Sequence, residues 1–340
     1  MTDRDPRAAT PYRPTLSAIA QQAGVSIATV SKVLNHRPDV SAQTRRRVEQ
    51  LLDHHGYPRR DREQPWLARS NLVDVLMIGM DDPWASQVLS AFEAAAREAG
   101  LGIVPAPVGA TTVPGEVLRR ILARGSRGMI FVFADLAPRQ RALLETAQVP
   151  YVLVGHGEAV PDGVRTVGID YRAGTRVATE HLIDLGRERI ALIVGSRGRL
   201  YDEDRVEGYR DALRERGIVV DPALVRTMEV FSEDCSRAET LGLWALDEPP
   251  TAIVAGTDMI AVGVFAALQE LGLRPGQDVG VVGFDGRPEA AWLRPPLTTI
   301  SQPLDEIARA AISLLTDERA GWTHTVRGTL VIRGSTVPRS

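Results

Sequence analysis

The hydrophobic positions near the start of the chain follow a helical period. Apolar side chains recur every three or four residues over 16–23, which predicts a short helix. Gly24 suits the left-handed end of that helix, and Ser26 is a typical N-cap for a second helix over 27–34. A short helix, a turn and a second helix form the unit that places one helix in the major groove of DNA. The pattern therefore predicts a helix-turn-helix module.

A third helix and two polar segments complete the first part of the chain. An amphipathic repeat predicts a helix from Ser41 to about residue 55, so we expect a headpiece over residues 13–57. Residues 1–12 are polar and contain two prolines, which favours a disordered lead. Residues 58–71 are charged, contain two prolines and have no long amphipathic repeat, so we interpret them as a hinge or linker.

Beyond residue 71, short apolar runs alternate with longer amphipathic segments. Uninterrupted apolar strands that alternate with helices favour parallel, doubly wound sheets with both faces covered. The predicted strands are LVDVLMIGM, GMIFVFA, PYVLVGH, RTVGID, RIALIVG, TAIVAG and DVGVVGF, and the predicted helices lie at 86–99, 172–185, 204–216 and 258–271. Because this number of strands is large for one sheet, we expect an α/β domain over 72–337 with two Rossmann-like lobes. One lobe would take 72–170 with 300–330, and the other 171–299.

The charge of the chain is unevenly distributed along its length. The formal net charge is −3, but residues 1–62 carry 11 Lys and Arg against 6 Asp and Glu. The predicted headpiece is therefore basic, as binding to DNA phosphates requires, while the remainder of the chain is acidic.

Several classes of protein are disfavoured by what the sequence lacks. The nucleotide-binding patterns GxGxxG and GxxxxGK[ST] and the hydrolase patterns GxSxG and HExxH do not occur, so we expect no enzyme and no cofactor. The lone Cys235 allows neither an intrachain disulfide nor a cysteine-rich metal site. With no run of about 20 apolar residues and no secretion signal, we expect a cytoplasmic protein without a membrane partner. A secreted sugar carrier would explain two lobes but not the headpiece.

Residues 15–57 resemble the headpiece of the LacI/GalR family of bacterial repressors. They read TLSAIAQQAGVSIATVSKVLNHRPDVSAQTRRRVEQLLDHHGY, and the resemblance continues through RIALIVG, RVEGYRDAL, TAIVAGTDMIAVGVFAAL, DVGVVGFDG and PPLTTISQP. It covers essentially residues 15–337. The resemblance implies a helix-turn-helix headpiece joined to a sensor domain of two lobes similar to periplasmic sugar-binding proteins, with the ligand between the lobes.

The family resemblance also implies which headpiece residues contact DNA. Ile27, Ala28 and Lys32 match the recognition-helix residues that set the operator sequence, and Lys32 can donate to guanine acceptors. Ala28 offers only a methyl group, so a solvent-facing filler is its alternative interpretation. The positions that match contacts to phosphates or neighbouring bases are Thr15, Ser26, Thr29, Ser31, Asn35, Ser41 and Thr44.

The linker departs from the family pattern. Relatives have a hinge helix here that wedges an apolar side chain into the minor groove, and Trp66 or Leu67 stands at the wedge position. Pro65 removes an amide donor and disfavours a helical conformation at the residue before it. We therefore expect an altered or shortened hinge.

In the sensor domain, Arg205 and Asp285 match the residues that grip the effector in the family. Asp82 and Trp84 follow the first predicted strand and so lie at the mouth of the expected cleft. An aromatic face with carboxylates and a guanidinium is suited to a sugar. Asp82 could instead cap the next helix, and Trp84 could belong to the core. The weaker matches to effector-binding positions are Phe231, Thr257, Asp258 and Gln302.

One position in the cleft departs from many relatives. His156 stands where they have an Asp, so one expected hydroxyl acceptor is missing. A histidine could substitute for it, although a lone loop histidine is more often simply solvated.

The sequence and the resemblance together predict a transcriptional regulator. We expect a repressor of carbohydrate-utilisation genes, whose operator binding is controlled by a small sugar or sugar-like effector. Two headpieces are needed to read a palindromic operator, so a homodimer is expected. The chain ends at GSTVPRS without a heptad-patterned tail, which favours a dimer over a tetramer.

Overall fold

The computed structural model divides the chain into two compact units, Met1–Ala68 and Arg69–Ser340. The residues that it describes are 16–34, 40–54, 70–80, 83–109, 112–156, 163–195, 200–228, 232–317 and 321–336. The predicted lead over 1–12 and most of the predicted linker, including Trp66 and Leu67, lie outside these residues.

The headpiece contains three helices, α1 (Leu16–Ala23), α2 (Ile27–Leu34) and α3 (Ala42–His54). They pack on a small apolar core of buried side chains, which are Ile19, Ala20, Ala23, Val30, Val33, Val48 and Leu52. These are the helices that the hydrophobic period predicts.

Local chemistry forms the turn between α1 and α2. Gly24 has a φ of +64°, the left-handed conformation that a residue without a Cβ adopts readily. The Val25 amide then donates to the Ala20 carbonyl at 3.0 Å. Ser26 Oγ accepts the Thr29 amide at 3.1 Å and so caps α2.

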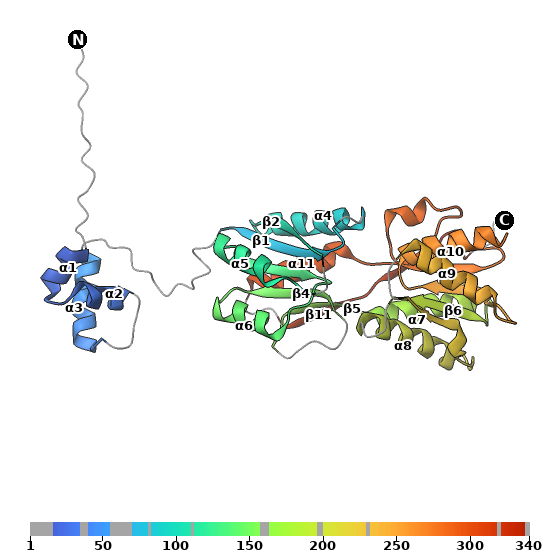
Figure 1. Cartoon of the computed structure of the whole chain (residues 1–340), viewed down its shortest axis with the longest axis horizontal. Helices are drawn as coiled ribbons and strands as arrows, with labels where there is room; N and C mark the ends of the chain where they lie inside the picture. The colour runs from blue at the N-terminus through green and yellow to red at the C-terminus, as the bar shows by residue number, and fades with distance from the viewer. Residues whose placement is uncertain are drawn as a thin grey trace, which may run out of the picture. The chain divides into compact units, whose positions relative to one another are not determined.

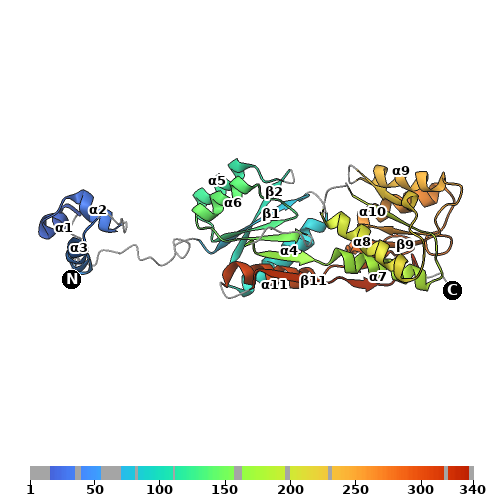
Figure 2. The ribbon, with the colours of Figure 1, turned by 90° about the horizontal axis from the view of Figure 1, so that it is seen from below.

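The first lobe of the sensor domain is a six-stranded parallel sheet in the order β11-β5-β4-β3-β1-β2. Helices α5 and α6 cover one face, and α4 and α11 cover the other (Figures 1 and 2). Its elements are β1 (Leu72–Ile78), α4 (Pro83–Glu98), β2 (Gly102–Val108), α5 (Gly115–Arg124), β3 (Gly128–Val132), α6 (Pro138–Thr146), β4 (Tyr151–His156), β5 (Thr166–Ile169), α11 (Leu304–Thr316) and β11 (Thr323–Val326).

The second lobe repeats this plan, with the strand order β12-β10-β9-β8-β6-β7 and only β12 antiparallel to its neighbour. Helices α7 and α8 cover one face, and α9 and α10 cover the other (Figure 2). Its elements are α7 (Tyr171–Asp184), β6 (Ile190–Val194), α8 (Leu200–Glu215), η1 (Pro222–Leu224), β7 (Val225–Thr227), α9 (Glu233–Trp244), β8 (Ala252–Ala255), α10 (Asp258–Glu270), β9 (Gly280–Asp285), η2 (Pro288–Ala291), β10 (Thr298–Ser301) and β12 (Thr329–Val331).

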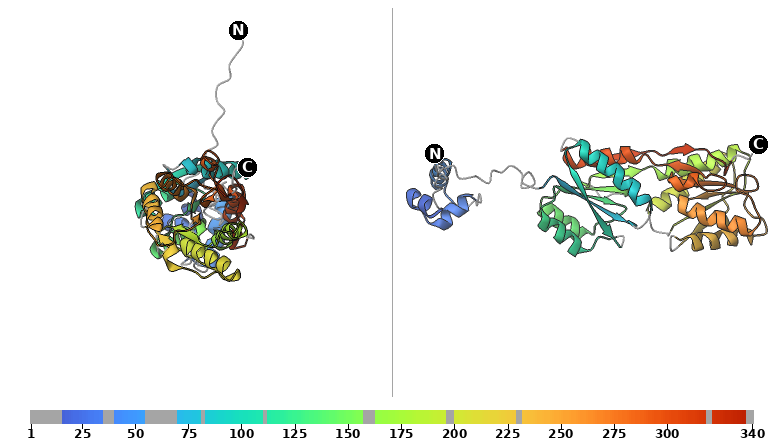
Figure 3. Two further views of the ribbon diagram at one scale, coloured as in Figure 1. Left: turned by 90° about the vertical axis from the view of Figure 1, so that its right-hand side faces the viewer. Right: turned by 90° about the horizontal axis from the view of Figure 1, so that it is seen from above.

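Within the described residues the chain passes between the two lobes three times. The crossovers follow β5, β10 and β11, and the last two appear as the red segments between the lobes in Figure 3. The first and third crossovers are tied together, because the Asp170 amide donates to the Val326 carbonyl at 2.9 Å and Arg327 Nε donates to Asp170 Oδ2 at 3.2 Å. Asp170 also caps α7 through the Ala173 amide at 2.9 Å.

Two predominantly parallel, helix-covered sheets in a two-lobed domain, joined to an all-α headpiece, confirm the predicted α/β fold class. The boundaries shift in places that matter for function. The helix predicted over 86–99 begins at Pro83. Trp84 therefore belongs to the first turn of α4 and not to the loop before it.

Candidate functional site

The headpiece exposes one side of α2. Ile27 is 51% exposed, Ala28 and Lys32 are also exposed, while Val30 and Val33 on the opposite side are buried. The three residues predicted to set the operator sequence therefore lie on the solvent side of the helix. An exposed helix face of this kind can enter a major groove.

Two hydroxyl pairs stand at helix N-termini of the headpiece. The Ser26 and Thr29 hydroxyl oxygens are 2.9 Å apart, and Ser41 Oγ donates to Thr44 Oγ1 at 2.9 Å. Each serine also accepts the amide of its threonine partner. Helix N-termini with exposed amides and hydroxyls favour phosphate oxygens.

The structure describes only some of the remaining residues that are predicted to contact DNA. Ser31 is partly exposed on α2, next to Lys32. Thr15 and Asn35 lie outside the described residues, as do the hinge residues Trp66 and Leu67. DNA contact by all of these residues stays a prediction.

The strand orders of the two lobes locate a second candidate site. In each sheet the order reverses beside the first strand of the lobe, between β1 and β3 and between β6 and β8. Ligands of doubly wound sheets bind at such points, beyond the carboxyl ends of the strands. Trp84 follows β1 and Thr257 follows β8, so both lie where a ligand is expected.

A cavity of about 230 Å³ lies at this position between the lobes. Trp84 contributes from the first lobe, and the other lining residues belong to the second: Ser232, Thr257, Met259, Ile260, Asp285 and Arg287. Of the predicted effector residues, the structure brings Trp84, Thr257 and Asp285 into this wall. Sequence reasoning missed Ser232, Met259, Ile260 and Arg287. The position of Arg287 two residues after Asp285 could have indicated it.

The first-lobe wall of the cavity is the indole of Trp84, which packs on a second aromatic ring outside the cavity lining. The Trp84 and Phe133 rings lie 5.6 Å apart at a tilt of 34°. Phe133 follows β3 and has a φ of +56°, a conformation that costs about 1 to 3 kcal/mol for a residue with a Cβ. Trp84 is 9% exposed, so it contributes both to the core and to the cavity wall.

Asp285 dominates the polar side of the cavity. It ends β9 with a φ of +113°, and Gln302 Nε2 donates to its Oδ1 at 2.7 Å. Desolvation, followed by the neighbouring Asp258 carboxylate, raises the pKa of Asp285 to about 8, although the Arg205 and Arg287 guanidinium groups oppose this shift. An acceptor with such partners can bind a hydroxyl group in either protonation state.

Arg205 on α8 lies behind the cavity wall and is 3% exposed. Its Nη1 donates to Asp202 Oδ1 at 3.0 Å, and its guanidinium carbon lies 4.4 Å from the centre of the Tyr171 ring and 5.0 Å from that of Phe284. Nε has no hydrogen-bond partner among the described residues. A buried donor without a partner costs free energy that a ligand oxygen can recover.

Comparison with known proteins assigns both units to one family. Residues 15–59 match the model of bacterial regulatory proteins of the lacI family, and residues 179–340 match a periplasmic binding protein-like domain. An uncharacterized HTH-type transcriptional regulator in the aml 5′ region of Streptomyces limosus is 36% identical over 99% of this chain and 98% of its own length. The chain belongs to the lacI family.

Solved structures agree with this assignment. A complex of the transcriptional regulator CelR with cellobiose has a TM-score of 0.70 and 28% identity, covering 95% of this chain and 100% of that one. The lac repressor dimer bound to operator and the anti-inducer ONPF has a TM-score of 0.68 and 27% identity, covering 96% and 100%. This lacI-family chain is therefore a DNA-binding transcriptional regulator, and the regulator class is confirmed over an enzyme.

The Asp258 carboxylate of this regulator accepts hydrogen bonds from other residues of the chain. It is 3% exposed, and its oxygens accept the Thr299 hydroxyl at 2.6 Å and the Arg287 amide at 2.8 Å. Burial raises the pKa of Asp258, and these two hydrogen bonds oppose the rise. The carboxylate therefore fixes the loop that carries Arg287 and Asp285. Direct contact of Asp258, Arg205 or Gln302 with an effector stays a prediction.

Two predicted effector residues, Asp82 and Phe231, lie outside the described residues, as does the His156 side chain. Among the side chains that are described, no group of three or more His, Cys, Asp or Glu could hold a metal ion. No described helix is long and apolar enough to span a membrane.

Proposed function

We propose that this regulator is a repressor of carbohydrate-utilisation genes, and that a small sugar or sugar-like effector in the inter-lobe cavity controls its binding to a palindromic operator. In this proposal residues 13–57 are the DNA-binding headpiece, 58–71 the hinge and 72–337 the effector-binding and dimerisation domain. The observation that carries the proposal is a cavity with an aromatic wall on one lobe and a carboxylate beside a guanidinium on the other.

The chemistry of the cavity favours a polyhydroxylated ligand. An indole face accepts the C–H face of a sugar ring, while carboxylate and guanidinium groups form directed hydrogen bonds with hydroxyl groups. We assign the strongest polar contacts to Asp285 and Arg205, with Trp84 as the stacking surface and Thr257 as a further hydrogen-bonding group. Asp82, Phe231, Asp258 and Gln302 complete the proposed site.

The headpiece supports sequence-specific binding. We assign base contacts to Ile27, Ala28 and Lys32 on the exposed side of α2. Phosphate or neighbouring-base contacts are assigned to Thr15, Ser26, Thr29, Ser31, Asn35, Ser41 and Thr44. Because one recognition helix contacts few base pairs, we infer that a homodimer reads two half-sites.

The experiment compares operator affinity with and without a sugar identified by thermal shift, for the parent chain and for Arg205→Ala and Asp285→Ala. Ligand binding to the folded state raises the melting temperature, so the screen requires no knowledge of the genes. Both variants should bind the operator as the parent does and lose the response to the sugar, because neither residue belongs to the headpiece. The coupling in the parent is expected on the scale of about 1 to 3 kcal/mol.

Arg210→Ala is the matched control. Arg210 lies on the same helix as Arg205 but is half-exposed, and its ion pair in the described part of the chain is with Glu207 at 2.7 Å, so this variant should keep the response. If Arg205→Ala and Asp285→Ala fold, bind DNA and still respond at the parent's sugar concentration, the effector site is wrongly assigned.

A further inference from the structure

Tyr171 joins the two lobes of the sensor domain by a hydrogen bond. It is the first residue of α7 in the second lobe, directly after the first crossover, and is 1% exposed. Its hydroxyl donates to the Gly155 carbonyl at 3.2 Å, and Gly155 belongs to β4 in the first lobe. Burial raises the pKa of Tyr171 far above its usual range, so the hydroxyl keeps its proton and remains a donor.

The ring of Tyr171 is held by Arg205. The guanidinium carbon of Arg205 lies 4.4 Å from the centre of this ring, closer than to the Tyr201 and Phe284 rings at 5.5 and 5.0 Å. Both of those rings also pack on Tyr171, at centroid distances of 5.8 and 5.7 Å. A cation over a desolvated aromatic face is attracted more strongly than at an exposed site. The Arg205 guanidinium and the Tyr171 ring are therefore in direct contact.

The other end of the hydrogen bond lies against Phe133, the ring that packs on Trp84 of the cavity wall. Gly155 has a φ of +82°, and a Cβ there would lie 2.3 Å from Phe133 Cε1. The Phe133 ring thus packs directly on the Gly155 backbone and on Trp84. The Phe133 amide also donates to the Val154 carbonyl at 3.0 Å. The Gly155 backbone and the Phe133 and Trp84 rings therefore form one packed cluster.

We propose that Tyr171 is a positioning residue that connects Arg205 in one lobe to Phe133 and, through it, to Trp84 of the cavity wall in the other. A ligand that draws the Arg205 guanidinium toward itself changes the placement of the Tyr171 ring, and the Gly155 hydrogen bond carries that change into the first lobe. The role of this connection in signalling rests on the proposed function, because Arg205 and Trp84 are assigned there to the effector. The connection itself exists without a ligand and can be measured without one.

The test is hydrogen exchange of the full-length chain, read in peptides covering β4 (Tyr151–His156). Tyr171→Phe keeps the ring and removes only the hydroxyl, so exchange in β4 should become about tenfold faster. Tyr209→Phe is the matched control, because Tyr209 is equally buried and donates to the Ile190 carbonyl at 2.7 Å within its own lobe. This control should speed exchange in β6 and leave β4 unchanged. Equal effects of both variants on β4 would reduce Tyr171 to a general stabilising residue.

A double-mutant comparison tests the connection to Arg205. Arg205→Lys keeps the charge beside Asp202 but loses the planar stacking group, so it should speed β4 exchange at least threefold in the parent. In the Tyr171→Phe background it should add less than twofold, because the path to β4 is already broken. If the effects of the two substitutions on β4 exchange are additive, the proposal is overturned. It is also overturned if Arg205→Lys alone leaves β4 exchange unchanged, and this outcome can be measured even if Tyr171→Phe fails to fold. Failure of the parent chain to bind an operator or to respond to a sugar would contradict the proposed function without altering these exchange rates.

Discussion

Asp285 and Phe133 are two of the three non-glycine residues with positive φ in the described part of the chain; Asp285 lines the cavity, and Phe133 packs on Trp84 of its wall. Such conformations persist only where surrounding contacts hold them, and they concentrate at functional sites. Gln302 restrains Asp285 by a hydrogen bond. Gly286 follows at a φ of +73°, where a Cβ would lie 2.4 Å from Ser301 Oγ. The backbone conformation at the end of β9 thus fixes the direction of the Asp285 carboxylate.

At the residue scale, Lys32→Ala should weaken operator binding and relax base preference. If Lys32 makes a good base-edge contact, the loss should be about 1 to 3 kcal/mol. Arg46→Ala is the control, since Arg46 is exposed on α3 and should weaken specific and random DNA about equally. Fluorescence anisotropy with both DNAs measures the two losses. Equal loss on both DNAs for Lys32→Ala would make it a phosphate contact.

The raised pKa of Asp285 gives stability a pH dependence. Because the folded state holds this proton to about pH 8 and the unfolded state releases it near the ordinary value of 3.8, the contribution of Asp285 is fully present below pH 3.8 and is lost as the pH rises to 8. Asp285→Asn removes this titration. The melting temperature of the variant relative to the parent should rise between pH 5 and pH 8, because only the parent loses this contribution over that range. A constant difference across this range would contradict the shifted pKa.

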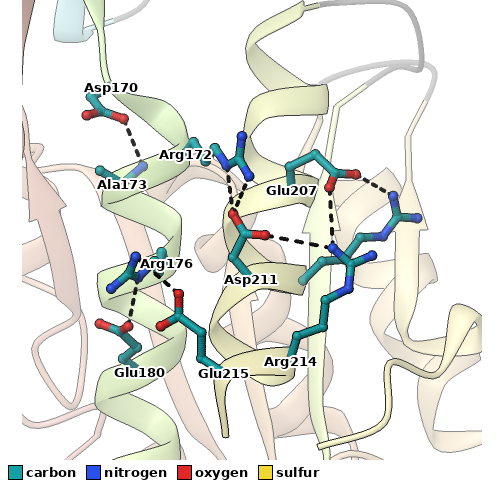
Figure 4. Close-up of polar contacts among 10 residues, drawn as sticks. Asp170, Arg172, Ala173, Arg176, Glu180, Glu207, Asp211, Arg214 and Glu215 are labelled. Carbon is teal, nitrogen blue, oxygen red and sulfur yellow. Dashed lines mark hydrogen bonds and ion pairs between the residues drawn. The ribbon is translucent and has the colours of Figure 1, made fainter. Parts of the chain in front are cut away.

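Between elements, the contact of α7 with α8 positions Arg205. Figure 4 shows ion pairs between the two helices, in which Arg172 contacts Asp211 at 2.6 Å and Arg176 contacts Glu215 at 3.4 Å. Exposed pairs of this kind contribute little each. The closer constraint is Gly208, where a Cβ would lie 2.1 Å from the Arg172 carbonyl oxygen. Backbone proximity, more than charge, fixes the distance between the helices.

Gly208→Ala should therefore destabilise the chain by about 1 to 3 kcal/mol, because overpacking outweighs the better helix propensity of alanine. Gly242→Ala on α9 is the matched control, since nothing lies within 4 Å of a Cβ at that position, and it should stabilise by about 0.5 to 1 kcal/mol. Urea denaturation of both variants measures the difference. A stabilised Gly208→Ala variant would mean that the helices separate without cost.

The predicted hinge is tested through Trp66 and Leu67. An apolar wedge unstacks a base step and costs a few kcal/mol, which the bent complex recovers through further contacts. Trp66→Ala and Leu67→Ala should therefore reduce operator affinity and DNA bending together. Bending is measured by energy transfer between dyes at the ends of the operator. If both variants bind and bend the operator as the parent does, the linker only connects the two units and inserts no wedge into DNA.

For the whole molecule, the proposed homodimer predicts a dependence on operator symmetry. A palindrome engages two headpieces, whereas a single half-site engages one and leaves the second on non-specific contacts. We expect affinity for the palindrome to exceed that for the half-site by at least about tenfold, which corresponds to 1.4 kcal/mol. Gel-shift titration with sedimentation of the free protein measures both affinity and assembly. Equal affinities, or a monomer throughout the binding range, would contradict the dimer.

The headpiece and most of the sheet scaffold were predictable from sequence because their causes are local. The Gly24 turn, the Ser26 cap and the apolar period of α1 involve residues within a few positions of one another. Strand β2 escaped prediction because Pro105 and Pro107 interrupt its pattern. Proline is tolerated there because β2 is an edge strand, where one side of the backbone needs no partner.

The cavity depended on tertiary structure. The sequence marked Trp84 because it follows a predicted strand, and parallel strands end at one edge of a sheet. Thr257 and Asp285 were marked by their match to the family's effector-binding positions. Nothing in the sequence indicated Ser232 and Met259, since only the folding of the second lobe brings the N-termini of α9 and α10, which are distant in sequence, to one wall. Nor could it orient Asp258, whose partners Thr299 and Arg287 lie 41 and 29 residues away in the chain. Periodic burial and helix capping depend on residues that are close in the chain, so they can be predicted from sequence. The direction of a buried polar side chain depends on the hydrogen-bond donors that folding brings to it, so it cannot.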